Sequence, residues 1–252
     1  MSAEAGGAAR GPGGTRGVLR AEDIRAGYGA GDIIHGVSVS VASVVGPNGS
    51  GKSTLLKALT GVVRLSSGRV LVGDRDITGL PPEEVARAGV GYVPQVDDVF
   101  APLTVRENLE MGGYLLAARE VSGRIDHVIG VFPRLGQMQT RRAGRLSGGE
   151  RKMLAMGRVL MLEPAVFLLD EPTANLAPQV AAELLTGHVR ALAEGGAAVL
   201  VVEQRARAVL AISDYTYVLG GGQVVMADTP ARLSASQEFT ESFFGAVPQT
   251  KK

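Results

Sequence analysis

A glycine-rich segment has the clearest chemical meaning in this sequence. It fits the phosphate-binding pattern G-x-x-x-x-G-K-[ST] at every fixed position, and its residues are Gly46, Pro47, Asn48, Gly49, Ser50, Gly51, Lys52 and Ser53. Glycines let the backbone curl so that successive N–H groups face one anion, and a helical pattern that follows from Thr54 adds its positive dipole end. Lys52 can then reach the outer phosphates of a nucleotide, and the Ser53 hydroxyl can hold Mg²⁺. A plain glycine-rich connection is the alternative, which the lysine, the hydroxyl and the flanking elements disfavour.

Two adjacent carboxylates, Asp170 and Glu171, follow an apolar strand pattern at residues 166–169. Because ligands of open α/β sheets bind at the carboxyl ends of strands, we expect both side chains to face the glycine-rich segment. Asp170 would hold Mg²⁺ through water, and Glu171 would orient or deprotonate an attacking water. The alternative is a strand that turns polar where it meets solvent.

A third segment combines a helix start with two glycines, at Leu146, Ser147, Gly148, Gly149 and Glu150. Ser147 is a good N-cap, and an apolar stripe follows it at helical spacing. Exposed backbone donors at a helix start can bind an anion, so this segment is a candidate second anion site. An ordinary capped helix explains the same residues, and these physical arguments alone do not choose between the two.

The elements that position these residues alternate between strand-like and helix-like patterns, which predicts an α/β fold with a largely parallel sheet. We expect strands at residues 18–24, 37–45, 69–72, 90–93, 165–169, 197–202, 215–219 and 223–226. We expect helices at residues 54–60, 83–88, 105–119, 149–162, 178–194 and 206–212. The glycines at 220–222 read as a hairpin turn.

Composition excludes several other classes of protein. Apolar residues make up 45% of the 252 residues, the net charge is +1, and the chain has neither Cys nor Trp. A large core can therefore form, whereas nucleic-acid binding, disulfides and thiolate metal sites are not expected. No apolar run reaches membrane-spanning length, and residues 1–17 read as a flexible tail without the apolar region of a signal peptide.

The order of the three motifs resembles that of the ATP-binding cassette (ABC) ATPases. The glycine-rich segment (the P-loop, residues 46–53) comes first, the segment 146–150 (the signature) second, and Asp170 and Glu171 with the following Pro172 and Thr173 third. The resemblance covers residues 18–244. The chain most resembles the ATPase subunits of branched-chain amino acid importers and their urea or amide relatives. The residues that carry this closer resemblance are those at 76–82, 103–109, 176–178 and 202–204.

The resemblance implies roles for further residues. Tyr28 falls where the family stacks an aromatic ring on adenine, although a packed loop tyrosine is a competing interpretation. Gln95 falls where the family has a glutamine that contacts Mg²⁺ or water. Ser147, Gly148 and Gly149 would bind the γ-phosphate held by an opposing subunit, so that each ATP lies between two chains.

Three features depart from the family pattern. Gln204 occupies the switch position, where most of these ATPases have His, and we interpret it as a neutral γ-phosphate sensor. The run at residues 37–45, predicted above to form one strand, is too short for the two strands and turn that the family has there, so either the chain is truly shortened or turn residues are missing. Asp97 and Asp98 are expected to form a solvated acidic turn, and the alternative is contact with a basic loop of a membrane partner.

The resemblance predicts the P-loop NTPase fold of the ABC type, with a mixed sheet core, an inserted helical subdomain and a small antiparallel β part. The expected divisions are a tail at 1–17, a nucleotide-binding core at 18–96 and 163–236, a helical subdomain at 97–162, and a C-terminal segment and tail at 237–252.

The resemblance also implies the function: Mg²⁺-dependent ATP hydrolysis in an importer, for branched-chain amino acids or related solutes. Implied partners are integral membrane permeases, a second ATPase subunit (identical or different) and, indirectly, a solute-binding protein. The chain would then lie in the cytoplasm, on the inner face of the cell membrane. The ATPase of an exporter or lipid transporter, and a regulator that binds ATP without hydrolysing it, remain as alternatives.

Overall fold

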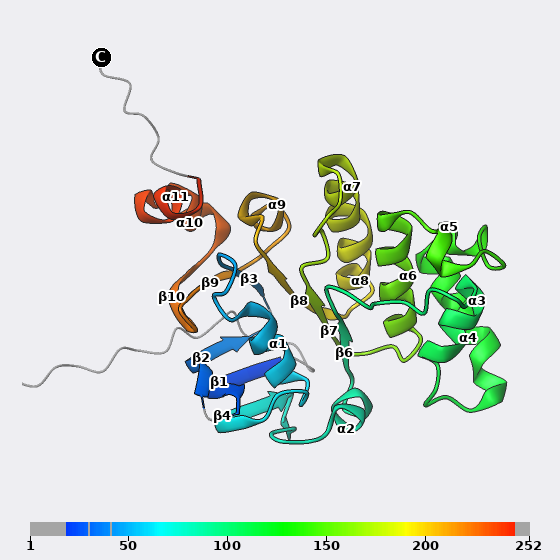
Figure 1. Cartoon of the computed structure of the whole chain (residues 1–252), viewed down its shortest axis with the longest axis horizontal. Coiled ribbons are helices and arrows are strands. Elements are labelled where there is room, and N and C mark those ends of the chain that lie inside the picture. The colour runs from blue at the N-terminus through cyan, green and yellow to red at the C-terminus, as the bar shows by residue number, and fades with distance from the viewer. Residues whose placement is uncertain (1–18, 30, 41, 245–252) are drawn as a thin grey trace, which may run out of the picture.

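Apolar strands form a mixed six-stranded sheet at the centre of the molecule (Figure 1). The computed structural model describes residues 19–29, 31–40 and 42–244. The strand order is β10-β9-β3-β8-β7-β6, with bounds β3 Ser43–Val45, β6 Val90–Val93, β7 Val166–Asp170, β8 Ala198–Glu203, β9 Thr216–Gly220 and β10 Gln223–Asp228. β3 pairs in parallel with β8 and β9, and β7 with β6 and β8, whereas β10 runs antiparallel to β9. The carboxyl ends of β3, β6, β7 and β8 therefore lie on the same side of the sheet.

A second, antiparallel sheet has the order β2-β1-β4-β5, with bounds β1 Leu19–Tyr28, β2 Gly31–Ser40, β4 Leu65–Val72 and β5 Arg75–Asp76. Helix α1 (Lys52–Leu59) contacts strands of both sheets. Its buried Leu55 and Leu56 share a core cluster with Ile24 of β1 and Leu168 of β7. This packing fixes the start of α1, where the P-loop ends, against the central sheet.

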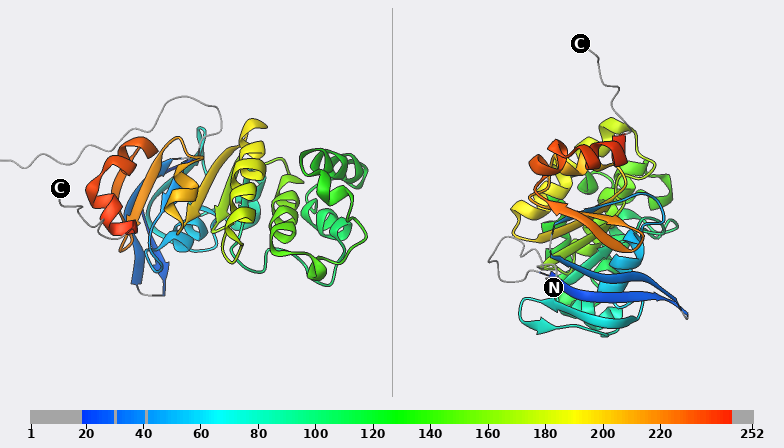
Figure 2. Two further views of the ribbon diagram at one scale, coloured as in Figure 1. Left: turned by 90° about the horizontal axis from the view of Figure 1, so that it is seen from above. Right: turned by 90° about the vertical axis from the view of Figure 1, so that its left-hand side faces the viewer.

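The remaining helices surround the sheets and extend the molecule at two ends (Figure 2). They are α2 Pro82–Arg87, α3 Val105–Gly112, α4 Ala118–Val131, α5 Pro133–Gly136, the 3-10 turn η1 Ala143–Arg145, α6 Gly148–Leu160, α7 Pro178–Glu183, the π-helical turn η2 Leu184–Val189, α8 Arg190–Glu194, α9 Ala206–Leu210, α10 Pro230–Ala235 and α11 Gln237–Phe244. Helices α3 to α6 gather at one end of the molecule, and α10 and α11 lie at the other (Figure 1). Alternate residues of β7 point to opposite faces of the sheet and belong to two hydrophobic clusters. Phe167 and Leu169 pack in the cluster that includes residues of α6, and Leu168 packs in the cluster that includes residues of α1.

Two sequence predictions about these elements are wrong. Residues 37–45 do not form one strand, because β2 ends at Ser40 in the antiparallel sheet and β3 starts at Ser43 in the central sheet. The second strand is only three residues long and is held on both sides, by β8 and by β9. The helix expected at 105–119 is divided, because α3 ends before Gly113 and α4 starts at Ala118.

The hairpin turn predicted at the glycines of residues 220–222 is confirmed. Gly221 and Gly222 have φ angles of 54° and 78° between β9 and β10, a conformation that glycine adopts without steric cost. The flexible tail expected at 1–17 and the end of the chain beyond residue 244 lie outside the described residues. Across the part of the chain that the structure describes, no helix has both the length and the apolar character needed to cross a membrane.

Candidate functional site

The P-loop leaves β3 and curls into the first turn of α1. Gly51 starts the helix at a φ of 101°, and no side chain caps the N–H groups of that turn. A Cβ on Gly46 would lie 2.4 Å from the Leu219 carbonyl oxygen, so only glycine fits there. The buried Ser50 hydroxyl has no hydrogen-bond partner within the described residues, and the Gly222 N–H braces the loop by donating to the Ser50 carbonyl at 3.0 Å. The loop therefore presents unused donors in a shape that suits a phosphate chain.

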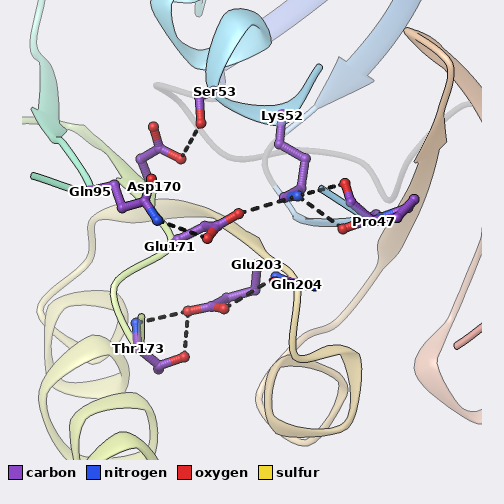
Figure 3. A network of polar contacts seen from close by, with 10 residues as sticks. Pro47, Lys52, Ser53, Gln95, Asp170, Glu171, Thr173, Glu203 and Gln204 are labelled. Carbon is purple, nitrogen blue, oxygen red and sulfur yellow. Dashed lines mark hydrogen bonds and ion pairs between the residues drawn. The ribbon is translucent and has the colours of Figure 1, made fainter. Parts of the chain in front are cut away.

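Lys52 is buried and lies against carbonyl oxygens and a carboxylate (Figure 3). Its ammonium donates to the carbonyls of Gly46 at 2.9 Å and Pro47 at 3.1 Å, and lies 3.2 Å from Glu171 Oε1. The P-loop cation and the second carboxylate of the β7 end thus meet directly, although they are far apart in the sequence.

Asp170 ends β7 and accepts two hydrogen bonds through different oxygens. Ser53 Oγ donates to its Oδ1 at 3.0 Å, and Tyr92 OH donates to its Oδ2 at 3.1 Å. Burial raises the pKa of Asp170, and the two hydrogen bonds oppose that shift. Burial, reinforced by the nearby Asp170 charge, also raises the pKa of the Tyr92 phenol. A hydroxyl and a carboxylate oxygen side by side are hard oxygen ligands, which is the donor set that Mg²⁺ prefers.

Glu171 is held in an uncommon backbone conformation just beyond the strand. Its φ is 43°, and its N–H donates to the Val202 carbonyl at 3.0 Å. Gln95, which follows β6, donates through Nε2 to Glu171 Oε2 at 3.1 Å. Each oxygen of this carboxylate therefore has one partner, Lys52 on one side and Gln95 on the other.

Glu203, a buried carboxylate to which the sequence analysis gave no role, directly precedes Gln204 and contacts the loop after β7. Glu203 ends β8, is 2% exposed, and accepts from the Thr173 N–H at 2.8 Å and the Thr173 hydroxyl at 2.7 Å. Its other oxygen accepts from the Gln204 N–H at 3.2 Å. Burial raises the pKa of Glu203, the Thr173 bonds oppose the shift, and the charge of Glu171 adds to it. This carboxylate joins the loop after β7 to the segment that carries Gln204 (Figure 3).

The signature segment starts α6 with a capping box. Ser147 Oγ accepts from the Glu150 N–H, while Glu150 Oε2 accepts from the Ser147 N–H at 2.9 Å. The Ser147 N–H, assisted by Arg134, lowers the pKa of Glu150 to about 2. A Cβ on Gly148 would lie 2.8 Å from Leu176 Cδ2, so this glycine permits close packing on the loop after β7.

The turn after Gln95 differs from its prediction. Asp97 is exposed as expected, but Asp98 is only 7% exposed and its Oδ2 lies 2.8 Å from Lys152 Nζ. The expectation of a solvated turn is therefore wrong for Asp98, which pairs within the chain.

The chain is similar in sequence and in structure to known proteins. The family model described as ABC transporter matches residues 38–174. The chain belongs to the ABC transporter family. A relative in Archaeoglobus fulgidus, named "Probable branched-chain amino acid transport ATP-binding protein LivF", is 40% identical over 235 residues, which is 91% of this chain and 100% of the relative. In Pseudomonas aeruginosa, the "High-affinity branched-chain amino acid transport ATP-binding protein BraG" is 37% identical and covers 90% of this chain and 100% of its own length.

Solved structures agree with the family assignment. An ATP-binding cassette of an ABC transporter in its ADP conformation matches this chain with a TM-score of 0.80 and 29% identity, over 92% of this chain and 100% of that one. The predicted ABC ATPase fold, with its mixed sheet and its antiparallel sheet, is confirmed. As an ABC ATPase, the chain is a nucleotide-binding subunit.

The cassette brings most of the predicted side chains into one cluster, and leaves others apart. Lys52, Ser53, Gln95, Asp170 and Glu171 are linked by the contacts above. By contrast, within the described residues no hydrogen bond or ion pair joins Tyr28, the Gln204 side chain or the signature glycines to these five residues. Tyr28 is 54% exposed, at the end of β1.

The sequence analysis missed Tyr92 and Glu203. A signal existed for Glu203, because it follows an apolar strand just as Asp170 does, and its strand was predicted. Tyr92 gave no such signal, since a tyrosine within a short strand is ordinary.

Proposed function

We propose that this ABC ATPase hydrolyses ATP in an importer for branched-chain amino acids or related solutes. The observation that carries the proposal is the cluster in which Lys52, Glu171 and Gln95 meet beside the uncapped start of α1. The names of the two reported relatives support this class of solute and give the exporter alternative no comparable support.

The nucleotide would be held mainly by backbone donors. The N–H groups of the P-loop and of the first turn of α1, which includes Thr54, would bind the phosphates, and Lys52 would neutralise the outer ones. Its present acceptors, the Gly46 and Pro47 carbonyls and Glu171, place the ammonium inside the loop. The exposed ring of Tyr28 would stack on the adenine.

Mg²⁺ would be held through Ser53, Asp170 and Gln95. When bound, this ion would neutralise charge on the phosphate oxygens. Ser53 and Asp170 already lie side by side, and Tyr92 orients the second oxygen of the carboxylate. Gln95 donates to Glu171 through Nε2, so its amide oxygen is the atom that would serve as a ligand.

Glu171 is the proposed base, because its carboxylate lies beside the P-loop lysine that would neutralise the outer phosphates. Lys52 and Gln95 hold its two oxygens, so the carboxylate has a fixed direction in which to accept a proton from water. Gln204 would donate a hydrogen bond to the γ-phosphate as a neutral group. Catalysis would then consist mostly of positioning and charge stabilisation.

A second ATPase subunit, identical or different, would complete each site. Ser147, Gly148 and Gly149 lie at the start of α6, and they would bind the γ-phosphate of the opposing subunit. The cassette would dock on integral membrane permeases, which receive solute from a binding protein, at the inner face of the cell membrane. Residues 96–115 are the proposed docking surface, since several large apolar side chains there are exposed, namely Val96, Phe100, Met111 and Tyr114.

A phosphate-release assay on the purified chain tests the activity. We expect Mg²⁺-dependent release of phosphate from ATP that falls by about 100-fold or more in Lys52→Ala. Binding of Mg–ATP without release would support the regulator that does not hydrolyse ATP, and absence of binding would overturn the proposal.

Uptake tests the solute. The chain would be expressed with its permeases and solute-binding protein, and uptake of labelled leucine would be compared between the wild type and Glu171→Gln. Uptake that requires Glu171 supports import of branched-chain amino acids. If hydrolysis occurs but leucine is not taken up, the solute assignment is wrong and the ATPase assignment stands.

A further inference from the structure

A buried lysine on the signature helix contacts the segment that carries Gln95. Lys152 of α6 is 7% exposed, and its ammonium lies 2.8 Å from Asp98 Oδ2. It also donates to the carbonyl oxygen of Gln95 at 2.7 Å and approaches that of Pro94 at 3.4 Å. A buried ammonium needs acceptors and a counter-charge, and both of its carbonyl acceptors and its ion-pair partner come from residues 94–98.

The neighbouring charges show that this contact is specific. Arg151 precedes Lys152 on the same helix and is exposed, and Asp97 precedes Asp98 and is exposed. Arg158, two turns further along α6, donates to the Asp98 carbonyl and lies over the Phe100 ring at 4.4 Å. The segment after Gln95 is therefore held against α6 both by its side chains, Asp98 and Phe100, and by the backbone carbonyl of Asp98.

Gln95 is consequently held from two sides. Its backbone carbonyl accepts from Lys152, and its side-chain Nε2 donates to Glu171 Oε2 at 3.1 Å. Because α6 begins with the signature glycines, one rigid helix carries both Lys152 and the residues proposed to meet the opposing nucleotide.

We propose that Lys152 is a positioning residue that holds Gln95 against Glu171 and ties this contact to the placement of the signature helix. The inference rests on the proposed ATPase function, and it assigns to Lys152 an effect on turnover in addition to its ion pair with Asp98. Lys152 itself touches no reacting atom.

The competing explanation is a purely structural ion pair, and a double variant separates the two. Lys152→Met leaves Asp98 buried without its cation, so we expect the thermal midpoint to fall by roughly 10 °C. Asp98→Asn combined with Lys152→Met removes both charges, and we expect it to recover most of that loss. It cannot recover the ammonium that donates to the Gln95 carbonyl.

Steady-state hydrolysis of Mg–ATP by the purified full chain is the deciding measurement. In the double variant, we expect kcat to fall about tenfold or more while KM changes less than about twofold, because a misplaced Gln95 would affect the reaction rather than ATP binding. Asp98→Asn alone, which keeps Lys152 on the Gln95 carbonyl, should retain most of the turnover. Arg151→Met is the matched control for an exposed cation one residue away, and it should hydrolyse ATP at the wild-type rate.

A further cycle tests whether Lys152 acts through Gln95. Gln95→Ala should lower kcat, and adding Lys152→Met with Asp98→Asn should lower it no further. Recovery of both stability and kcat in the double variant, or losses that multiply in this cycle, would overturn the inference while leaving the ATPase assignment intact. A wild-type chain without hydrolysis would instead overturn the proposed function, and this inference with it.

Discussion

Lys52 Nζ lies 3.2 Å from Glu171 Oε1, so the P-loop cation and the carboxylate beyond β7 form a direct, largely buried ion pair. The chain brings them together because β3 and β7 both pair in parallel with β8, so their carboxyl ends emerge at the same edge of the sheet, on either side of β8. A cation that would face the outer phosphates and a base that would face the attacking water are thus placed by the central sheet rather than by local sequence.

Glu171→Gln should abolish most of the turnover. The amide keeps the size of the side chain but cannot accept a proton, so we expect kcat to fall by about 100-fold or more. Mg–ATP binding should remain, since the P-loop donors are unchanged, and a nucleotide-binding titration beside the phosphate-release assay measures both. Glu163→Gln, at an exposed carboxylate paired with Arg124, is the control and should hydrolyse ATP normally. Turnover near the wild-type rate in Glu171→Gln would show that Glu171 is not the base.

Tyr92→Phe should raise the Mg²⁺ requirement. The phenol donates to Asp170 Oδ2, and without it the carboxylate loses a group that fixes its direction toward Ser53. Residues that orient a metal ligand typically affect affinity by about 10- to 100-fold, so we expect about a tenfold rise in the Mg²⁺ concentration for half-maximal activity. A magnesium titration at fixed ATP measures it. Tyr114→Phe, at an exposed ring, is the matched control, and an equal rise in both variants would contradict the role of Tyr92.

Gln204→Ala should lower turnover, and Gln204→His should make it depend on pH. Loss of a hydrogen bond to a charged phosphate should reduce kcat by about tenfold. A histidine there would titrate near its ordinary pKa of about 6.5, so activity of that variant should change between pH 6 and 8 relative to the wild type. A kcat profile at saturating ATP measures both effects. If Gln204→Ala matches the wild type, Gln204 is an ordinary polar residue at the end of a strand.

The parts of this site that could be predicted from the sequence are those whose residues are consecutive in the chain. The P-loop, the signature segment and the pair Asp170 and Glu171 are each local patterns that carry their own strand and helix context. Five of the predicted strands, which correspond to β6 to β10, lie within two residues of the observed bounds at both ends. Among them, β7 is buried throughout, which leaves an apolar run that is easy to recognise.

The remainder depends on contacts between distant residues. Tyr92 acquires its role from Asp170, which is 78 positions away, and Lys152 from the carbonyl of Gln95, 57 positions away. No period or spacing encodes such pairs. The division of residues 37–45 into β2 and β3 was missed for a related reason, since a three-residue strand is stable only because β8 and β9 flank it.

Glu203 should make the stability of the protein fall as pH rises. Burial raises its folded pKa above the ordinary value of 4.5, so the folded state binds this proton more tightly than the unfolded chain does. The stability contributed by this proton is fully present below pH 4.5 and is lost as pH rises through the folded pKa. Glutamine at this position stays neutral at every pH. As pH increases from 4.5, the free energy of unfolding of Glu203→Gln should therefore rise relative to that of the wild type.

Denaturant unfolding at several pH values measures the difference in free energy of unfolding between Glu203→Gln and the wild type. The prediction concerns how this difference changes with pH, not its size at any one pH. A glutamine at 203 also changes the hydrogen bonds with Thr173 and Gln204, which shifts stability by a constant amount. Thr173→Val removes one donor that opposes the raised pKa of Glu203, so the fall in stability of this variant should extend to higher pH. Loss of this hydrogen bond to a buried carboxylate should cost about 1–3 kcal/mol at neutral pH. Glu163→Gln corrects for general carboxylate effects. Parallel curves for Glu203→Gln and the wild type would mean that burial does not hold a proton on Glu203.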